Sequence, residues 1–453
     1  MPRTLAVVLF TLIVLPVISP AQQHDMSGMD MAPPPMKTMT MQRNTMHQPS
    51  TLIESELRHA SSGTSAEPTS TPAPLLMSHH GPWMLMLHGT AFISDTQQSS
   101  QRGGDKLFST NWLMPMAMRH LGPGQLTLRA MFSLEPATVS GRQYPELFQQ
   151  GETAFGKPII NGQHPHNFFM EVAALYDIPL GKQTLLSFYA APIGDPAIGP
   201  IAYPHRLSAS EDPIAALGHH QQDSTHIAYN VLTAGITWRG LRFEESGFHG
   251  GEPTEQRWGF QPSPNGHAID SYSSRVTFSP SPNWSGQYSI AHIVSPEALY
   301  PNEDQQRQTA SIMYNRPFGN TGPDGAHFGN WSSTLLWGRT RSLADDSKEN
   351  SYLAESLLKF SGRNYLWARI EDAGRSSELL LSPGSKLPPD FEESPIGHVQ
   401  AYSFGYDRDF RIAPHLLAAP GAQFTSYTAP QALVPAYGHH PFGVVTFIRF
   451  RID

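Results

Sequence analysis

Apolar and polar residues alternate with a period of two along most of the chain from about Trp83 to the C-terminus. The alternation is clear in residues 126–132, 274–278, 287–292 and 400–406, and clusters of Gly, Pro, Asn, Asp and Ser separate such segments. This pattern predicts short strands joined by turns. Roughly fourteen to sixteen segments follow it, and no long helical period competes with them.

The two faces of these predicted strands differ in chemistry. One face is apolar or aromatic, and the other carries ionisable groups such as Arg129, Arg275, Arg369 and Glu371. The last stretch has an apolar face and a basic face, formed respectively by Phe442, Val444, Ile448, Phe450 and Ile452, and by Arg449 and Arg451. Lipid-facing and lumen-facing side chains alternate in this way in membrane barrels. We therefore predict an all-β fold, an antiparallel outer-membrane β-barrel of roughly 12–16 strands.

Aromatic residues near the predicted strand ends fit the girdles that such barrels place at the membrane interfaces. They are Trp83, Trp112, Tyr189, Trp238, Trp284, Trp331, Trp337, Tyr365 and Trp367. The alternative is a soluble all-β protein such as a sandwich or a propeller, whose strands also alternate. The sequence has no blade-length repeat, which argues against the propeller.

The N-terminal part of the chain has a different texture. A basic start, an apolar run over residues 5–18 and a small-residue end at Ala21 predict a secretory signal peptide over residues 1–21. Residues 22–75 are rich in Met, Pro, Ser, Thr and Gln, so we predict a disordered Met/His-rich tail and linker there. The barrel domain is predicted over residues 76–453, with the tail in the periplasm.

Composition narrows the chemistry. The chain has no cysteine, so the predicted fold contains neither disulfides nor thiolate ligands. A formal net charge of −8 argues against a nucleic-acid partner. The chain has 17 Met and 21 His, and thioether and imidazole are ligands that suit copper, above all Cu(I). Copper is therefore the expected cofactor.

The first group of candidate ligands lies in the tail, where His24, Met26, Met29 and Met31 stand close together. Thioethers stay neutral and bind a soft metal ion without losing a proton. Exposed methionines have no packing role. We predict that the tail binds copper; the alternative is a low-complexity linker that is rich in Met.

The second group lies on two predicted strands, in which residues i, i+2 and i+4 share a face. The two faces carry Met84, Met86 and His88, and Met114, Met116, Met118 and His120. Pointing inward, they would form a sulfur ladder that ends in imidazole and binds metal; pointing outward, they would be lipid-facing apolar surface. Pro115 cannot donate a ladder hydrogen bond, so this strand is expected to be an edge, to be bulged or to begin there.

The third group consists of histidines in two compact segments. His164 and His166 form an HxH pair, and the second segment contains His219, His220, Asp223 and His226. Imidazole and carboxylate at such short spacing are typical of divalent or Cu(II) sites. The alternative is that these are ordinary polar residues of surface loops.

No catalytic signature accompanies these residues. The sequence has no HExxH, no GxSxG and no phosphate-binding glycine loop. Asp223, Ser224 and His226 are too close in sequence to form a triad, whose members come from distant positions. We predict that the protein is not an enzyme.

Four sequence segments resemble a family of uncharacterised bacterial proteins. They are residues 162–171, 223–226, 248–258 and the pair 295–297 and 302–304. The resemblance spans about residue 80 to 410 and implies an outer-membrane β-barrel associated with copper or heavy-metal handling. The order of signal peptide, Met/His-rich tail and barrel is also similar in architecture to copper resistance protein B.

The leading hypothesis is an outer-membrane barrel that binds Cu(I) or Cu(II) for copper tolerance, by sequestration or export. The expected partners are outer-membrane lipid, copper ions and a periplasmic copper carrier or oxidase. The first alternative is a general porin-like or structural barrel with incidental methionines. The second is a secreted β-rich metalloenzyme.

Overall fold

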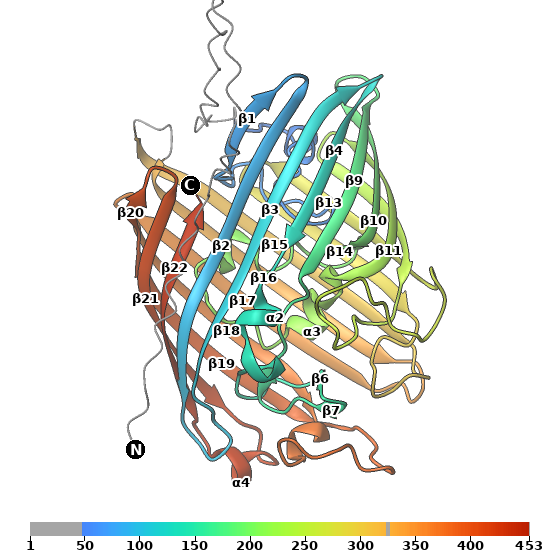
Figure 1. The fold of residues 1–453 in the computed structure, drawn as a ribbon, viewed down its shortest axis with the longest axis vertical. Coiled ribbons are helices and arrows are strands. Elements are labelled where there is room, and N and C mark those ends of the chain that lie inside the picture. Colours follow the sequence, from blue (N-terminus) through green and yellow to red (C-terminus); the bar gives the residue numbers. More distant parts are fainter. Residues whose placement is uncertain (1–47, 323–326, 453) are drawn as a thin grey trace, which may run out of the picture. The chain divides into compact units, whose positions relative to one another are not determined.

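Sixteen antiparallel strands form the wall of a closed barrel in the computed structural model, which describes residues 48–322 and 327–452 (Figure 1). In chain order they are β2 (Trp83–Gln98), β3 (Lys106–Leu121), β4 (Gly124–Phe132), β9 (Phe169–Pro179), β10 (Thr184–Gly194), β11 (Ala228–Trp238), β12 (Leu241–His249), β13 (Ser271–Ser281), β14 (Trp284–Ile293), β15 (Gln305–Thr321), β16 (His327–Ser342), β17 (Lys348–Phe360), β18 (Asn364–Ser376), β19 (Pro395–Arg408), β21 (Leu416–Thr428) and β22 (Phe442–Ile452). Each pairs with the next, and β22 pairs with β2 to close the barrel. The predicted fold class is confirmed.

The remaining elements are short. They are the helices α1 (Leu52–Glu56), α2 (Glu135–Thr138), α3 (His219–Gln222) and α4 (Val434–Tyr437), the 3-10 turns η1 (Ser140–Arg142), η2 (Leu207–Ala209), η3 (Ser224–His226) and η4 (Ser377–Leu380), and the strands β1 (Leu76–His80), β5 (Tyr144–Pro145), β6 (Thr153–Ala154), β7 (Lys157–Pro158), β8 (Gly162–Gln163) and β20 (Phe410–Ala413). Within the described ranges, no helix has the length and apolar character needed to cross a membrane.

Side chains alternate between the two faces of the wall as the sequence pattern predicts. In β22, Ile448 is 45% exposed and points outward, while Arg449 is fully buried inside the barrel. Trp238, Trp284 and Trp331 also point outward near strand ends, where a girdle is expected. The girdle prediction is wrong for four aromatics whose side chains pack inside the barrel, namely Trp112, Tyr189, Tyr365 and Trp367.

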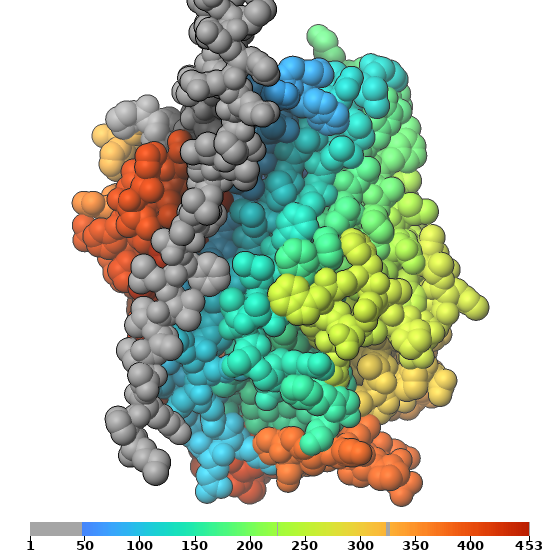
Figure 2. Space-filling view, viewed as in Figure 1, coloured from blue at the N-terminus to red at the C-terminus, as the bar shows by residue number. Residues whose placement is uncertain are grey.

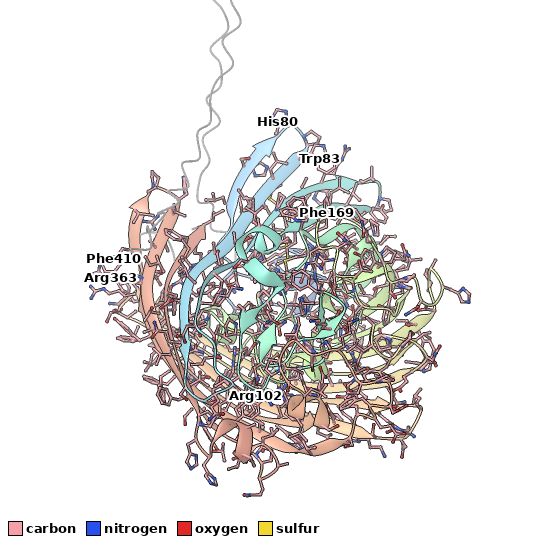
Figure 3. The ribbon with its side chains drawn as sticks, turned by 60° about the horizontal axis from the view of Figure 1, so that its bottom comes forward. His80, Trp83, Arg102, Phe169, Arg363 and Phe410 are labelled. Atoms are coloured by element: carbon pink, nitrogen blue, oxygen red, sulfur yellow. The ribbon has the colours of Figure 1, made fainter. Side chains whose placement is uncertain are left out.

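The two ends of the barrel differ. At one end, drawn at the top of Figure 1, the strands are joined by short turns such as residues 122–123, 180–183 and 239–240. At the other end lie long connections, of which residues 133–168 and 195–227 carry many buried side chains. Figure 3 turns this end forward; His80 and Trp83 mark the short-turn end, and Arg102 marks the loop end.

Residues 133–168 also meet residues 250–270 at the loop end, as the space-filling view shows on its lower front (Figure 2). Phe168 packs against Trp258 with ring centroids 5.7 Å apart, and Phe169 packs against Phe260 at 4.5 Å. Arg142 forms an ion pair with Glu255 at 2.6 Å. Three of the sequence segments that carry the family resemblance, 162–171, 223–226 and 248–258, therefore adjoin the same end of the barrel.

The structure differs from the prediction over residues 48–75, which were expected to be a disordered linker. This segment, hereafter the N-terminal plug, packs against inward-facing charges of the wall. The guanidinium of Arg129 donates to the carbonyl oxygens of Gly63 at 2.6 Å and His59 at 3.1 Å. Arg275 donates to the hydroxyls of Thr64 at 2.8 Å and Ser65 at 2.6 Å. The plug is mostly polar, so these hydrogen bonds hold it in place together with the burial of Leu52 and Leu75.

The plug also lies close to the loop 195–227. Gly63 has a φ of 61°, and a Cβ atom there would lie 2.7 Å from the side chain of Asp195. Glu67 accepts a hydrogen bond from the backbone N–H of Leu207 at 2.8 Å. The rest of the predicted tail, residues 22–47, lies outside the described residues.

Candidate metal centres in the barrel lumen

The strand methionines point into the barrel. The register sets them opposite one another across β2 and β3, in the pairs Met84 with Met118, Met86 with Met116, and His88 with Met114. Side chains directly opposite on one face of an antiparallel pair are neighbours. The two ladders that the spacing suggested are therefore a single surface. These methionines therefore do not face lipid, which was the alternative prediction.

This surface is buried and contains further methionines. Met86, Met114, Met116 and Met118 are 0–5% exposed. They form one cluster with Met77 of β1, Met131 of β4 and Met170 of β9, and Met84 packs against it. We call these eight side chains the sulfur wall. The plug residue Leu75 belongs to the same cluster, so the plug end covers part of the wall.

Pro115 does not interrupt β3, contrary to the expectation of an edge, a bulge or a strand start. It lies opposite Leu87 of β2, and β3 continues on both sides of it. On the other side, the register with β4 includes Leu113 with Phe132 and Met116 with Arg129. Proline points outward here, between the inward-facing Met114 and Met116.

The imidazole at the end of the ladder, His88, faces a second histidine from the loop 195–227. The ring centroids of His88 and His205 are 5.7 Å apart, and the ring of Trp112 lies tilted beside His205 with its centroid at 4.4 Å. The Nε2 atom of His205 lies 3.2 Å from the Sδ atom of Met131. The Nε2 atom of His88 is buried without a hydrogen-bond partner among the described residues. His120, at the other end of the ladder, is exposed and lies outside this group.

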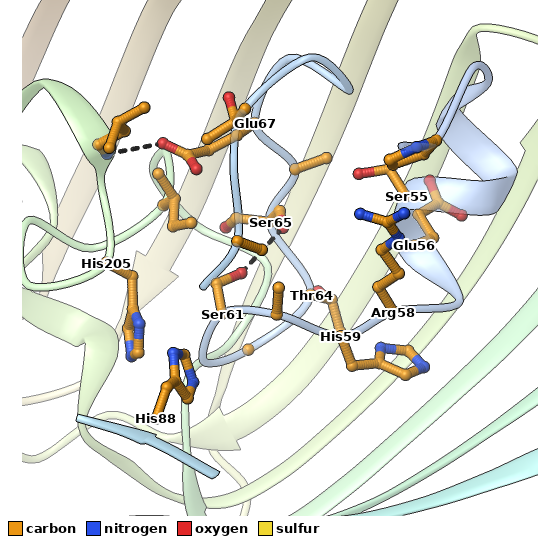
Figure 4. A pocket seen from close by; sticks show the side chains of 18 of the residues that line it. Ser55, Glu56, Arg58, His59, Ser61, Thr64, Ser65, Glu67, His88 and His205 are labelled. Carbon is orange, nitrogen blue, oxygen red and sulfur yellow. Dashed lines mark hydrogen bonds between the residues drawn. The ribbon is translucent and has the colours of Figure 1, made fainter. Parts of the chain in front are cut away.

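These two histidines line a cavity of about 160 Å³ between the wall and the plug. Figure 4 shows His88 and His205 beside each other, with the plug residues Ser61, Thr64 and Glu67 across from them. Burial, together with the neighbouring His88 and Arg129, holds the pKa of His205 well below its ordinary value. The imidazole of His205 is therefore neutral and able to bind a metal ion at neutral and mildly acidic pH.

A second candidate centre lies in the long loops and joins two of the predicted histidines. One atom each of Glu152, His164 and His220 lies within 4.8 Å of the others. The Oε1 atom of Glu152 is 2.8 Å from Nε2 of His164 and 3.8 Å from Nε2 of His220. Two imidazoles and a carboxylate form a donor set that suits a divalent ion.

The remaining loop histidines are held by carboxylates. His166 Nδ1 lies 2.9 Å from Glu135, and His219 Nδ1 contacts Asp223. Their rings gather with that of His226, whose centroid lies 5.4 Å from His166 and 5.2 Å from His219. The structure therefore brings the predicted histidines of both segments together. Asp223, however, is shared with a guanidinium, since Arg206 lies 3.2 Å from its carboxylate.

Charges around the loop centre tune its protonation. Burial raises the pKa of Glu152, but His164, His220 and Arg257 outweigh it, so the pKa falls below its ordinary value. Burial lowers the pKa of His164, and it lowers that of His220 further. Burial and repulsion from Glu152 raise the pKa of Glu252 to about 8. The centre therefore presents one ionised carboxylate and two neutral imidazoles near neutral pH.

Most of these candidate ligands were predicted from the sequence, but some were not. Glu135, Glu152, Met131 and His205 were not among the predicted ligands. Met131 has an inward position in the predicted strand 126–132, which was a usable signal. No sequence signal joins the other three to their partners, because the contacts depend on how the loops fold back. The predicted tail ligands His24, Met26, Met29 and Met31 lie outside the described residues.

No protein-family model and no curated relative matches the chain. Among solved structures, it is similar to the anion-selective porin from Comamonas acidovorans, with a TM-score of 0.48 and 12% identity over 82% of this chain and 100% of that chain. It is also similar to Pseudomonas putida OprB, with a TM-score of 0.49 and 10% identity over 82% and 94% of the two chains. A third similar structure is Salmonella typhi OmpF in complex with daunomycin, with a TM-score of 0.48 and 8% identity over 83% of this chain and 100% of that chain. The resemblance to a copper-associated barrel family stays a prediction.

Proposed function

We propose that the protein is a porin-like outer-membrane channel whose passage is restricted by the N-terminal plug and the inward-folded loops. The supporting observation is the division of the barrel wall into an apolar exterior and a charged interior. Phe243 and Val276 point outward, at 45% and 40% exposure, whereas Glu244 and Arg275 of the same strands point inward. An apolar exterior suits lipid, and a polar interior suits water and solutes.

The restriction is supported by the burial of the interior charges. Arg275 and Arg449 are 1% and 0% exposed, although they face the lumen. In a wide water-filled barrel such side chains would be hydrated. Here Arg275 binds the plug, and Arg449 is paired with Glu211 of the loop 195–227 at 2.5 Å. Passage through the lumen therefore requires the plug or a loop to move.

The orientation follows from the two ends of the barrel. Outer-membrane barrels place short turns in the periplasm and long loops outside the cell. This assignment puts the plug at the periplasmic side and the centre at Glu152 at the outer mouth. The tail would then extend into the periplasm, as predicted from the sequence.

Conductance across a planar bilayer tests the channel. We expect the full chain to give small single-channel steps and a variant lacking residues 48–75 to give larger ones. A variant lacking only residues 22–47 is the matched control and should conduct like the full chain. Heat-modifiable gel mobility verifies that each barrel is folded. Absence of conductance from a folded barrel that lacks the plug would contradict the channel.

Copper handling is the second candidate function, supported by the inward placement of the sulfur wall. These thioethers face the interior of the barrel and not lipid, and thioethers are ligands that a soft metal ion prefers. In this proposal the tail captures Cu(I), and the wall accepts it, for sequestration or export. A periplasmic copper carrier or oxidase is the proposed partner.

The metal content of the purified protein tests this second function. We expect copper to co-purify with the full chain and to fall in part when residues 22–47 are removed, with the remainder bound in the barrel. A variant with the tail methionines changed to leucine controls for the effect of shortening the chain. Copper at background level in the full chain, after growth in copper-supplemented medium, would contradict copper handling and leave the channel proposal intact.

A further inference from the structure

One histidine and two methionines of the sulfur wall lie in one row across neighbouring strands. His88 of β2 is opposite Met114 of β3. The pairs Leu113 with Phe132 and Met116 with Arg129 place Met114 opposite Met131 of β4. Adjacent strands are about 4.8 Å apart. The row therefore presents one imidazole and two thioethers to the lumen within two strand spacings.

A fourth donor reaches this row from the loop 195–227. His205 places Nε2 3.2 Å from the Sδ atom of Met131, and its ring lies 5.7 Å from that of His88. Metal–nitrogen and metal–sulfur bonds of about 2.0 and 2.3 Å span a separation of about 3.2 Å when they meet at about 95°. One ion can thus bind both atoms with little movement of either side chain.

The donors are poorly satisfied without an ion. The buried Nε2 atom of His88 has no hydrogen-bond partner among the described residues. Nε2 of His205 contacts the thioether of Met131, which accepts hydrogen bonds only weakly. Buried polar atoms are normally hydrogen-bonded, and leaving one unpaired destabilises the fold. A bound cation would satisfy both nitrogens at once.

The charge around the row favours a monovalent ion. None of the four donors is anionic, and the nearby cation Arg129 is neutralised by Glu171, whose carboxylate it contacts at 2.6 and 2.8 Å. Placing a divalent ion among neutral buried donors is costly, because nothing compensates its charge. A soft monovalent cation bound by imidazole and thioether carries half that charge, so this cost is lower. The centre at Glu152 differs, since its carboxylate supplies a negative charge.

We propose that His88, Met114, Met131 and His205 form a binding site for a soft monovalent cation, Cu(I) or its analogue Ag(I). The site adjoins the cavity between the wall and the plug, from which an ion can enter. This inference rests on the copper-handling proposal and names the place in the barrel where the ion binds. It does not depend on channel activity.

Chelator competition with Cu(I), under anaerobic conditions, tests the site in the full-length protein in detergent. We expect Met131→Leu and His205→Phe each to lower the affinity of one Cu(I) equivalent by at least about tenfold, because even loss of a residue that only supports a metal ligand costs that much. Met313→Leu is the matched control: Met313 is also buried and inward-facing, but it lies on β15, outside the sulfur wall. X-ray absorption of the copper-loaded full chain should show both sulfur and nitrogen neighbours.

The results separate the two proposals. If the full chain binds Cu(I) and Met131→Leu matches Met313→Leu at every equivalent, the site is overturned while copper handling stands. If the full chain binds no Cu(I), both are overturned. A leucine at position 131 conserves volume, and heat-modifiable mobility reports whether the barrel is folded. Should His205→Phe misfold, His88→Asn gives the same test from the opposite side of the site.

Discussion

The sulfur wall and the histidine loops are both rich in metal-ligating side chains, but they differ in what surrounds each donor. In the loops, a carboxylate accompanies each of three histidines: Glu135 lies beside His166, Glu152 beside His164, and Asp223 beside His219. Beside the sulfur wall, the neighbours of His88 are uncharged: Met114, Trp112 and His205. The residue type is the same, while its partners define a hard and a soft environment.

Ligand identity alone therefore does not select a metal. A carboxylate stabilises a divalent ion and also a protonated imidazole, so it adds a proton as a competitor. A thioether does neither. We therefore expect divalent ions to bind at the outer loops and soft monovalent ions to bind at the sulfur wall.

The largest effect is expected where the loop 195–227 contacts strand β17 of the barrel. Arg206 is fully buried between Glu355 at 2.6 Å and Asp223 at 3.2 Å. Changing Arg206→Met removes the guanidinium that these two buried carboxylates share. Glu355 keeps Arg369 at 3.2 Å, and Asp223 keeps His219. The loss should cost about 3–5 kcal/mol. Hydrogen exchange should then show loss of protection over residues 201–226, and the histidine cluster should disperse.

An exposed ion pair provides the control for this change. Lys348 lies 3.2 Å from Asp346, and both side chains are exposed. Lys348→Met should leave the stability almost unchanged, as is usual for surface pairs. Equal effects of the two substitutions would show that the buried pairs do not hold the loop.

At the sulfur wall, the stability of the barrel should depend on side-chain volume and not on charge. Met116 is 3% exposed within the sulfur wall. We expect Met116→Ala to destabilise the barrel by about 2–5 kcal/mol because it leaves a cavity. Met116→Leu should cost less than about 1.5 kcal/mol, because it conserves volume. Urea titrations of the detergent-folded protein measure both. A leucine as harmful as an alanine would mean that the sulfur atom itself supports the fold.

Local periodicity was sufficient to predict the strands and the faces of the wall. The alternation that puts Ile448 outside and Arg449 inside is visible in the sequence, as is the common face of Met84, Met86 and His88. Whether that face points inward could not be predicted, because apolar methionine suits lipid and core equally well. The register of Met84 with Met118 is also a property of strand pairing across a turn, which periodicity does not specify.

The plug and the loop centre show where sequence reasoning ends. Residues 48–75 have the composition of a linker, and they are ordered by donors such as Arg129 and Arg275, which are far away in sequence. Glu152 and His220 are 68 positions apart and meet only because two loops fold to the same end of the barrel. Contacts of this kind depend on the tertiary fold, so a single sequence carries no local signal for them.

The two centres should separate by metal type. We expect Glu152→Gln to lower Cu(II) affinity by about tenfold, or about 1.4 kcal/mol, while Ag(I) binding stays unchanged. Burial lowers the pKa of His164 and of His220, so protons compete less with the metal here than at a surface histidine pair, and Cu(II) binding should persist to a lower pH. Isothermal titration at pH 5.5 and 7.5 measures this. Loss of Ag(I) binding in the same variant would mean that the two centres are not independent.

The smallest effect concerns acid sensitivity, which the loops should have and the wall should lack. Glu255 accepts hydrogen bonds from the N–H groups of Phe155 at 2.7 Å and Gly156 at 2.9 Å. Burial opposes ionisation, but these N–H groups and Arg142 outweigh it and hold the pKa of Glu255 below its ordinary value.

A depressed carboxylate pKa stabilises the folded loop above the unfolded value near 4.5, and this stabilisation is lost as the pH falls through the folded pKa. The partly exposed position of Glu255 limits the effect to about 0.5–1 kcal/mol. Proteolysis within residues 153–157, with an acid-tolerant protease, should therefore accelerate between pH 5 and 3 in the native chain. In Glu255→Gln the rate should already be high at pH 5 and change little, because the amide does not titrate. A native loop that is equally protected at both pH values would show that this carboxylate does not hold the two loops together.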